Sequence, residues 1–388
     1  MNVAYITDSL PPIMDGVGRC VVESAKTFTK DNHGKCIVVA PHIPKSKNIE
    51  YPFPVLRFPT LGLPKMEYRM GYPFVPALVK KFKEYNIEII HAHSPFIAMS
   101  VARQIRNKLH IPIVYTQHTK WEFDIARAVP MPPMRKFLEN FVYKNINAAD
   151  EVWTVSNKTG EHIKARGFRG DYIVMENGTD FLRADVNENF LADINAKYEL
   201  EENVPFLFFV GRMMWYKNQR VIFDALEILK GKDFKFKMAL VGDGRDLADM
   251  KKVIREKNLH NQVFFAGKIS DRELLRAYYT RANMFVFPST YDNAPLVIRE
   301  AAACSCPSLV IRGSSAAEII EENVTGFCSD ESPESVAESI AAAFGNKDLY
   351  EFVKQNATER VYLPWSKVIA NSVARYGEVC AAYKNKEK

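Results

Sequence analysis

Residues 287–304 read Phe287-Pro-Ser-Thr-Tyr-Asp-Asn-Ala-Pro-Leu-Val-Ile-Arg-Glu-Ala-Ala-Ala-Cys304. A strand-like run, 282–287, leads into this stretch, and its second half has the pattern of a helix. When a strand passes through a polar turn into a helix, the first N–H groups of the helix face the space above the sheet and suit an anion. Asp292 and Glu300 add carboxylates that accept hydrogen bonds from sugar or ribose hydroxyls. The stretch therefore predicts a site for a nucleotide sugar.

The alternation of strand and helix continues along the whole chain. Amphipathic stretches such as 19–30, 95–109 and 220–229 separate short apolar runs, which are typical of a parallel sheet covered on both faces. This pattern predicts an α/β fold with two doubly wound, Rossmann-like domains. The expected strands are 2–7, 36–40, 87–91, 111–116 and 151–155 in the first half, and 205–210, 236–241, 262–266, 283–287 and 307–311 in the second.

The domain boundaries follow from the length and from one interruption of the pattern. With 388 residues the chain exceeds the size at which one core keeps growing. Turn residues and charges replace the apolar periodicity between 177 and 202. We expect an N-terminal domain over 1–180, a C-terminal domain over 181–365, and a last helix, within 366–388, that crosses back to the N-terminal domain. Ligands of such folds bind at the carboxyl ends of the strands, here in a cleft between the domains.

The composition is that of an ordinary globular protein, with 47% hydrophobic and 25% charged residues. No apolar run reaches the roughly 20 residues that span a bilayer, and the N-terminus lacks the pattern of a signal peptide. We therefore expect a cytoplasmic protein. The six cysteines form no Cys-x-x-Cys pair and have no histidines at zinc-like spacing, so we expect them to serve packing rather than metal or redox chemistry.

The net charge of +6 lies entirely in the first half. Residues 1–180 hold 24 Lys and Arg against 17 Asp and Glu, and the remainder holds 28 against 29. This asymmetry favours a partner such as a membrane surface or a charged acceptor, with a solvated basic face as the alternative. Nucleic acid is not an expected partner.

Two loops of the second half carry groups suited to a diphosphate. Arg212 and Lys217 follow the strand 205–210, where a planar fork and a point charge can clamp a diphosphate from two sides. Val241-Gly-Asp-Gly244 follows the next strand and is either a turn that lets a ligand approach the backbone or an ordinary tight turn.

The first half offers a glycine loop and three histidines. Gly16 and Gly18 lie between the first strand and the first helix, but Val21 breaks the dinucleotide pattern G-x-G-x-x-G. His118 follows the strand 111–116 and is a candidate for a functional role. His91 and His93 point to the same face of a strand, but the sequence offers no third metal ligand. We expect His91 to be structural.

Five blocks in this order resemble glycosyltransferase family 4, the retaining enzymes of GT-B fold: Gly211-Arg…Lys217, Val241-Gly-Asp-Gly244, Phe287-Pro-Ser289, the acid Asp292 with seven residues between it and Glu300, and Thr325-Gly-Phe327. The His-Ser-Pro-Phe block at 93–96 and the Thr-Gln-His-Thr block at 116–119 also look like those of bacterial diacylglycerol glucosyltransferases. The resemblance implies transfer of a hexose, with UDP-glucose as the expected donor, and retention at the anomeric carbon. It also implies site residues. We expect the catalytic group to be His118, Arg212, Lys217 and Asp292, and the donor to bind Gly16, Gly18, Gly211, Arg212, Lys217, Asn293, Ala294, Pro295, Leu296 and Glu300.

The chain departs from the family pattern at three positions. Asp292 stands where Glu is usual, Ser305 where a Gly follows Ala-Cys, and Tyr216 where an acidic residue often precedes the Lys. The shorter Asp292 affects the choice of sugar more than the reaction class. No Asp-x-Asp occurs in the sequence, so we expect no metal and no cofactor, with cations and helix N-termini neutralising the leaving diphosphate.

The acceptor is expected to be a membrane lipid such as diacylglycerol. Segments 64–76 and 121–137 and the pair Lys80-Lys81 mix aromatic, methionine and basic residues in a way that suits a lipid interface, with the protein peripheral on the inner membrane face. His93 and Trp121 are the residues expected to line the acceptor site. The alternatives are that these aromatics belong to the core, that the acceptor is a soluble sugar or polysaccharide precursor, or that the chain is a catalytically silent binding module. A phosphorylase or an epimerase is a further alternative. A phosphorylase would normally carry a lysine that binds pyridoxal phosphate, and nothing in the sequence marks one.

Overall fold

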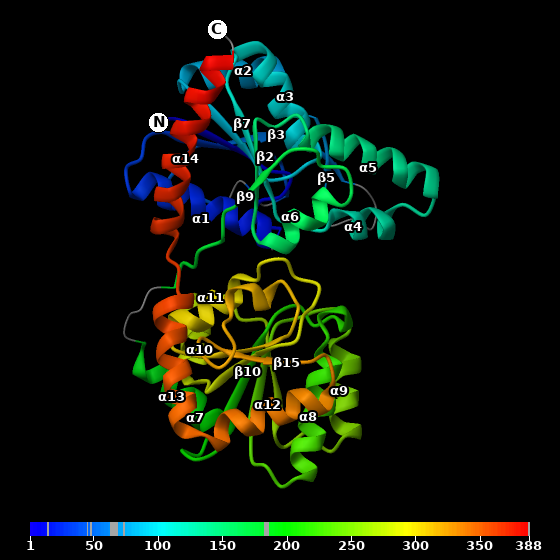
Figure 1. Ribbon diagram of the computed structural model, residues 1–388, viewed down its shortest axis with the longest axis vertical. Helices are drawn as coiled ribbons and strands as arrows, with labels where there is room; N and C mark the ends of the chain where they lie inside the picture. The colour runs from blue at the N-terminus through cyan, green and yellow to red at the C-terminus, as the bar shows by residue number, and fades with distance from the viewer. Residues whose placement is uncertain are drawn as a thin grey trace. The chain divides into compact units, whose positions relative to one another are not determined.

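The computed structural model describes residues 1–13, 15–44, 46, 49–62, 69–72, 74–181 and 186–386. It forms two compact units (Figure 1). The N-terminal unit comprises Met1–Asn177 and Trp365–Lys388, and the C-terminal unit comprises Gly178–Pro364. The divisions expected from the sequence, after 180 and after 365, lie close to these. The expected interface segment 64–76 lies partly outside the described residues.

The N-terminal unit is built on a sheet of seven strands in the order β3-β2-β1-β6-β7-β8-β9, and every neighbouring pair is parallel. A further antiparallel pair joins β4 (Leu61–Gly62) and β5 (Arg69–Met70). Central strands such as β1 and β2 are buried along their whole length, as expected of a sheet covered on both faces. The strands are β1 (Val3–Ile6), β2 (Cys36–Pro41), β3 (Val55–Phe58), β6 (Ile89–Ala92), β7 (Ile113–Gln117), β8 (Glu151–Thr154) and β9 (Tyr172–Val174).

Helices cover both faces of this sheet (Figure 1). The first six in the chain are α1 (Gly16–Lys30), α2 (Val75–Glu84), α3 (Ile97–Leu109), α4 (Trp121–Ala128), α5 (Pro132–Ile146) and α6 (Asn157–Lys164). The last helix, α14 (Trp365–Lys386), belongs to the same unit and buries Ile369 and Tyr376 in its core. The ring of Tyr376 stacks on Trp153 of β8, with 5.3 Å between the ring centroids. The C-terminal helix therefore completes the N-terminal core.

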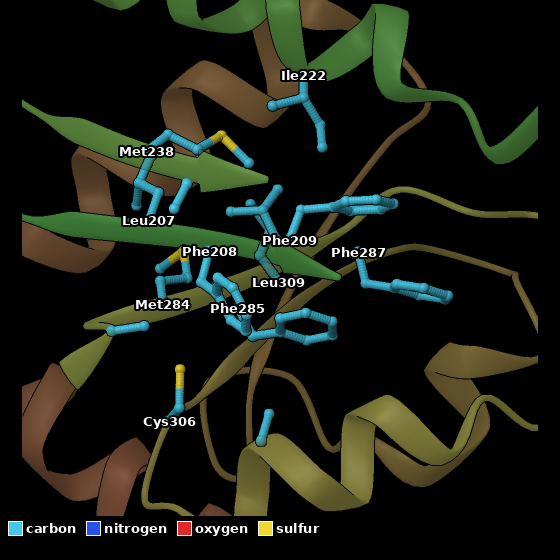
Figure 2. Packing of buried hydrophobic residues seen from close by; sticks show 14 of the residues in the cluster. Leu207, Phe208, Phe209, Ile222, Met238, Met284, Phe285, Phe287, Cys306 and Leu309 are labelled. Atoms are coloured by element: carbon cyan, nitrogen blue, oxygen red, sulfur yellow. The ribbon is translucent and has the colours of Figure 1, made fainter. Parts of the chain in front are cut away.

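The C-terminal unit has a parallel sheet of six strands in the order β12-β11-β10-β13-β14-β15. Phenylalanine rings dominate its core: Phe208 and Phe209 of β10 pack against Phe285 and Phe287 of β13 (Figure 2). The strands are β10 (Phe206–Val210), β11 (Lys237–Val241), β12 (Val263–Gly267), β13 (Met284–Phe287), β14 (Ser308–Ile311) and β15 (Phe327–Ser329).

Side-chain caps begin several helices of the C-terminal unit. Asp271 caps α10 by accepting from the N–H groups of Glu273 and Leu274, and Ser332 caps α12. Its α-helices are α7 (Glu188–Tyr198), α8 (Gln219–Gly231), α9 (Leu247–Glu256), α10 (Arg272–Arg281), α11 (Leu296–Ala303), α12 (Pro333–Gly345) and α13 (Lys347–Asn356); the shorter turns are η2 (Trp215–Lys217), η3 (Ala316–Ile319) and η4 (Ala357–Val361).

Both sheets are doubly wound, which confirms the fold expected from the alternation of strands and helices. The strand order reverses between β1 and β6 in the N-terminal unit and between β10 and β13 in the C-terminal unit. Ligands of open α/β sheets bind at the carboxyl ends of the strands beside such a reversal. The loops after these four strands are therefore where a site is expected.

Candidate active site

In the C-terminal unit, the fold brings three of the predicted loops to one edge of the sheet. β11, β10 and β13 are neighbours and run parallel, so the loops that follow them leave from the same edge. These loops hold Gly242, Arg212 with Lys217, and Asp292 respectively. Residues 75 positions apart in the sequence thus meet.

Lys217 and Asp292 form an ion pair, in which the Lys217 ammonium donates to one carboxylate oxygen of Asp292. Lys217 is only 8% exposed, and its ammonium lies 5.5 Å from the ring centroid of Tyr216 and 5.7 Å from that of Tyr291. The other carboxylate oxygen of Asp292 is buried and has no hydrogen-bond partner among the described residues. The position at which the family often has an acidic residue, Tyr216, instead supplies a ring beside the ammonium.

Local hydrogen bonds hold the loop between β10 and α8 in place. Asn218 adopts a left-handed conformation, φ 66°, and its side-chain amide donates to Pro288 O (3.3 Å) and to Glu331 Oε1 (2.8 Å). The buried Gln219 donates to Arg212 O at 3.0 Å. Because these contacts tie the loop to the turn after β13, Lys217 is presented from a fixed backbone. The Arg212 side chain is exposed.

The glycine turn after β11 serves packing between loops. A side chain on Gly242, φ 142°, would place a Cβ 1.9 Å from Gly211 O, and one on Gly244 would place it 2.3 Å from Met213 O. Met213 N also donates to Asp243 O at 3.0 Å. Of the two readings of Val-Gly-Asp-Gly, the structure supports a tight turn, whose glycines let the loop with Arg212 lie against it. Gly211 contributes too, since a Cβ there would lie 3.1 Å from the ring of Phe209.

The turn from β13 into α11 has the arrangement expected from residues 287–304. Asn293 is buried, Ala294 and Pro295 are half-buried, and α11 begins at Leu296. The N-terminal end of a helix carries a partial positive charge and N–H groups without intrahelical partners. This end of α11 begins four residues after Asp292, which pairs with Lys217.

Glu300 is held inside the unit and is 1% exposed. Arg272 Nη2 donates to Glu300 Oε1 at 3.1 Å, and the Tyr279 hydroxyl donates to Oε2 at 3.1 Å. Arg272 also donates to both oxygens of Asp180, at 2.6 and 3.2 Å. The partners of the Glu300 carboxylate in this structure are therefore protein groups, and a ribose contact stays a prediction.

In the N-terminal unit, Gly16 and Gly18 differ in their surroundings. Gly18 N–H donates to Asp15 Oδ1 at 2.7 Å, which caps α1, and a Cβ on Gly18 would lie 3.1 Å from Ser9 O. Gly18 is thus explained by capping and close packing. A Cβ on Gly16 would meet nothing within 4 Å, so Gly16 has the open surroundings that a ligand needs.

The three histidines lie together at the carboxyl ends of β6 and β7. His93 Nδ1 and His118 Nε2 are 2.9 Å apart, and the His91 and His93 rings pack with 4.1 Å between centroids. Both nitrogens of His91 are hydrogen bonded, to the Tyr376 hydroxyl and to Thr116 Oγ1, each at 2.6 Å. His91 therefore ties α14 and β7 to β6, and His93 links this group to His118.

Burial determines the protonation of this histidine group. Desolvation lowers the pKa of His118 to about 4 and places the pKa of His91 and of His93 well below the ordinary value. All three imidazoles are therefore neutral at pH 7. Burial acts in the opposite direction on Asp8, after β1, raising its pKa to about 7, although N–H groups at the start of α3 lower it in part.

Trp121 differs from the role expected for it. It is 1% exposed and packs edge-on against Phe96 and Tyr143, with centroids 6.3 and 5.2 Å away. A ring covered in this way has no face left for an acceptor. Trp121 is therefore a core residue, which was the alternative interpretation of this segment. His93, the other expected acceptor residue, is also buried, at 5% exposure.

Sequence reasoning missed the groups that hold Glu300. Arg272, Tyr279 and Asp180 belong to no block of the family pattern, and only their tertiary contacts reveal them. A signal existed for Arg272, which stands at the first position of α10 next to its capping residue Asp271. A basic residue there is unfavourable toward the helix dipole, which suggests a specific partner.

Two family models match the chain. Glycosyltransferase Family 4 matches residues 14–182, and Glycosyl transferases group 1 matches residues 192–360. The chain belongs to glycosyltransferase family 4. The first match ends a few residues beyond Asn177 and the second lies within the C-terminal unit, so the division seen in the structure is close to the division between the two family domains.

Relatives and solved structures agree with this assignment. The alpha-monoglucosyldiacylglycerol synthase of Streptococcus pneumoniae is 24% identical over 79% of this chain and 70% of that protein. The GDP-mannose-dependent alpha-mannosyltransferase of Corynebacterium glutamicum is 22% identical over 85% of this chain and 77% of that protein. The crystal structure of Anabaena Alr3699/HepE in complex with UDP has the same GT-B fold, with a TM-score of 0.78 and 19% identity over 97% of this chain and all of that one. The chain is therefore a glycosyltransferase.

Proposed function

We propose that this glycosyltransferase moves a hexose, with retention, from UDP-glucose to a hydroxyl of a membrane lipid such as diacylglycerol, without a metal ion. The observation that carries the proposal is the buried ammonium of Lys217, held by Asp292 in the loop beside the strand reversal at β10 and β13. Asp292 offsets the cost of burying this ammonium, and a diphosphate beside the pair would be a second anionic partner for it.

The donor diphosphate binds between Lys217, Arg212 and the start of α11. The exposed Arg212 offers its planar fork, Lys217 offers a fixed point charge, and the N–H groups after Asn293 offer the helix dipole. These groups stabilise the negative charge that grows on the leaving diphosphate, which is where electrostatic catalysis contributes most. Asp292 holds Lys217 in place before the donor binds, and its second oxygen contacts the transferred sugar.

UDP-glucose is the donor that the similarities favour. Anabaena Alr3699/HepE has been crystallised with UDP, and the streptococcal relative is named for a glucosyl lipid. The Corynebacterium relative uses GDP-mannose, so the base and the sugar are what a donor screen must distinguish. Glu300 binds the ribose hydroxyls at the base of this site.

The transfer takes place on one face of the sugar. The bond between the anomeric carbon and the diphosphate oxygen breaks, the acceptor oxygen forms its bond to the same face of that carbon, and the hydroxyl proton passes to the departing diphosphate. No side chain serves as the base. His118 lies over the sugar. Since its pKa of about 4 leaves the imidazole uncharged at pH 7, it acts there as a neutral hydrogen-bonding group.

The lipid acceptor is supported by exposed apolar residues on α4 and α5. Figure 1 shows these two helices at one edge of the N-terminal unit. Met134, Phe137 and Phe141 follow one another along α5 at helical spacing, and Phe137 is 65% exposed. The exposed Lys136 and Lys144 lie on the same helix. Apolar side chains beside cations suit the headgroup region of an anionic membrane, where the protein sits on the inner face without crossing it. None of the described helices combines the length and the hydropathy that a bilayer crossing requires.

Turnover with defined acceptors tests the proposal. We expect UDP-glucose to give a glucosylated product with diacylglycerol in mixed micelles that contain an anionic lipid, and the rate to be unchanged by a chelator. Product from a soluble sugar and none from diacylglycerol would replace the lipid acceptor with a soluble one. Binding of the nucleotide without transfer to any acceptor would leave a silent binding module.

A matched pair of variants tests the membrane surface separately. Phe137→Ser removes an exposed ring and should weaken binding to anionic vesicles on the order of 10-fold or more, since burying such a ring is worth roughly 1.5 to 3 kcal/mol. Phe352→Ser removes a ring that is also exposed, at 52%, but lies in the C-terminal unit. It should leave vesicle binding intact. Equal losses in both variants would reject α5 as the membrane contact.

A further inference from the structure

His93 lies between two other imidazoles with its polar atoms unequally used. Its Nδ1 is 2.9 Å from His118 Nε2, and the two rings are nearly parallel, with an interplanar angle of 19°. It also packs against His91, and Tyr5 contacts it with 5.7 Å between centroids. His93 Nε2 is buried and has no hydrogen-bond partner among the described residues.

This arrangement allows two placements of the protons. A neutral imidazole carries one N–H, so one ring of the pair donates and the other accepts. If His118 Nε2–H donated, His93 would carry its proton on Nε2, where a buried donor would lack an acceptor. If His93 Nδ1–H donates, Nε2 is a buried acceptor without a partner. Buried N–H groups without partners are rarer than unsatisfied acceptors, so the second placement is favoured.

We propose that His93 is a positioning residue, which holds the His118 ring in place and fixes its proton on Nδ1. His93 donates from Nδ1 to His118 Nε2, so Nε2 of His118 is an acceptor and Nδ1 of His118 is a donor. His91 supports His93 by stacking and is itself anchored by Tyr376 and Thr116. The direction of the His93–His118 hydrogen bond follows from the buried Nε2 of His93, which has no partner among the described residues.

The consequence for chemistry rests on the proposed function, in which His118 lies over the transferred sugar. With its proton on Nδ1, His118 donates a hydrogen bond to a sugar oxygen and accepts none through that atom. It therefore orients an oxygen of the donor sugar and does not remove a proton from a hydroxyl there. This fits a transfer in which the leaving diphosphate takes the proton.

The tautomer can be read without any turnover, by long-range ¹H–¹⁵N NMR of the full-length protein labelled with ¹⁵N-histidine. Comparison with His118→Asn identifies the His118 signals. We expect wild-type His118 to show the coupling pattern of an Nδ1–H imidazole at neutral pH. An Nε2–H pattern in the wild-type protein would overturn the proposal whatever the activity.

Three variants separate a positioning role from a packing role. His93→Asn keeps an amide donor close to the position of Nδ1, and His93→Phe keeps the stacked ring but removes the donor. His260→Asn, at an exposed histidine of the C-terminal unit, is the control. We expect the Phe variant to lose the Nδ1–H pattern and the Asn variant to keep it. An unchanged His118 pattern in His93→Phe would show that His93 does not set the tautomer.

Kinetics give a second readout. The Phe variant should lose on the order of 10- to 100-fold in kcat with little change in KM for the donor, because misplacing a group at the reacting sugar affects the transition state more than binding. The Asn variant should recover most of this loss. Equal losses in both variants at matched thermal stability would reduce His93 to a packing residue. Absence of transfer in the wild-type protein would instead refute the proposed function and leave the tautomer result standing.

Discussion

The two units present opposite kinds of polar groups at the same place in the same fold. The C-terminal unit gathers charges in pairs: Lys217 after β10 contacts Asp292 after β13, and Arg272 at the start of α10 contacts Glu300 in α11. The N-terminal unit gathers neutral rings after β6 and β7, where burial lowers the pKa of each histidine. Charges suit a diphosphate, and neutral rings suit sugar hydroxyls and an uncharged acceptor. The two units therefore differ in the kind of ligand group that each can bind.

The largest effect is expected from removing a positive charge in the C-terminal unit. Lys217→Met should lower kcat/KM by roughly 30- to 1000-fold, which corresponds to a loss of roughly 2 to 4 kcal/mol of transition-state stabilisation. The charge removed is one that the leaving diphosphate needs. Arg212→Ala should fall in the same range. Steady-state kinetics with Lys252→Met, at an exposed lysine of α9, provides the control, and a normal rate for Lys217→Met would remove it from the leaving-group role.

Acidification should destabilise the N-terminal unit, which holds the buried neutral histidines. Between pH 7 and 5 a histidine of the unfolded chain, with a pKa near 6.5, takes up a proton. The same histidine in the folded protein has a lowered pKa and stays neutral. The free energy of unfolding therefore falls by about 2 kcal/mol for each histidine that stays neutral. Asp8, whose pKa is raised to about 7, acts oppositely, because the folded carboxyl takes up a proton that the unfolded one does not. Because the loss from the three histidines exceeds the gain from the one carboxyl, the free energy of unfolding falls by about 3 kcal/mol in total.

Hydrogen exchange resolves this loss by unit. After correction for intrinsic exchange rates, protection of β6 and β7 should decrease between pH 7 and 5, while protection of β10 and β13 should hold. The C-terminal unit is the internal control, since its histidine, His260, is exposed. Equal behaviour of the two sheets would contradict the assignment of neutral buried imidazoles to the N-terminal unit.

Glu300→Gln tests the second charged pair of the C-terminal unit. Loss of the carboxylate should weaken UDP binding on the order of 10-fold, as expected for hydrogen bonds to a charged group. Calorimetry with the free nucleotide measures this directly. Tyr279→Phe keeps the carboxylate and removes one of its donors. A loss limited to Glu300→Gln supports the ribose contact, and undiminished affinity in that variant counts against it.

Ser305→Gly should have the smallest effect. Ser305 has a φ of 57°, in the left-handed region, at the position where the family usually has glycine. Relief of this strain should raise the free energy of unfolding by about 0.5 to 1 kcal/mol, reduced by the greater freedom of glycine in the unfolded chain. The bond from Thr358 Oγ1 to Ser305 Oγ (3.1 Å) is lost as well. Denaturant titration should show Ser305→Ala to be less stable than the glycine variant, since alanine keeps the strain; the reverse order would be inconsistent with this account.

The fold followed from the sequence because its signals are local. Each of the ten strands expected from apolar runs overlaps a strand of the structure, and the turn after β13 opens α11 as the polar stretch 288–295 predicts. Short strands at the sheet edges, such as β9 and β15, were not expected, because three residues give too little pattern to recognise.

The site followed only in part, because its pairing is tertiary. Family blocks pointed to Lys217, Asp292 and Glu300, but no spacing rule shows that the first two are ion-paired or that Arg272 holds the third. Trp121 was expected at the acceptor because an aromatic within a basic segment resembles a membrane interface. Its neighbours on α5 are exposed, whereas Trp121 faces the core, and the helical pattern of 121–128 alone does not distinguish these faces.

Titration of UDP into the full-length protein tests most directly the claim that the C-terminal unit neutralises the diphosphate with its own groups. Calorimetry is carried out with a chelator and again with Mg²⁺ or Mn²⁺, for the wild type and Lys217→Met. We predict equal wild-type affinity in both buffers and a loss of at least about 10-fold in the variant, the size of one charged hydrogen bond. Wild-type binding that appears only with a divalent ion, or that Lys217→Met leaves unchanged, would contradict the account.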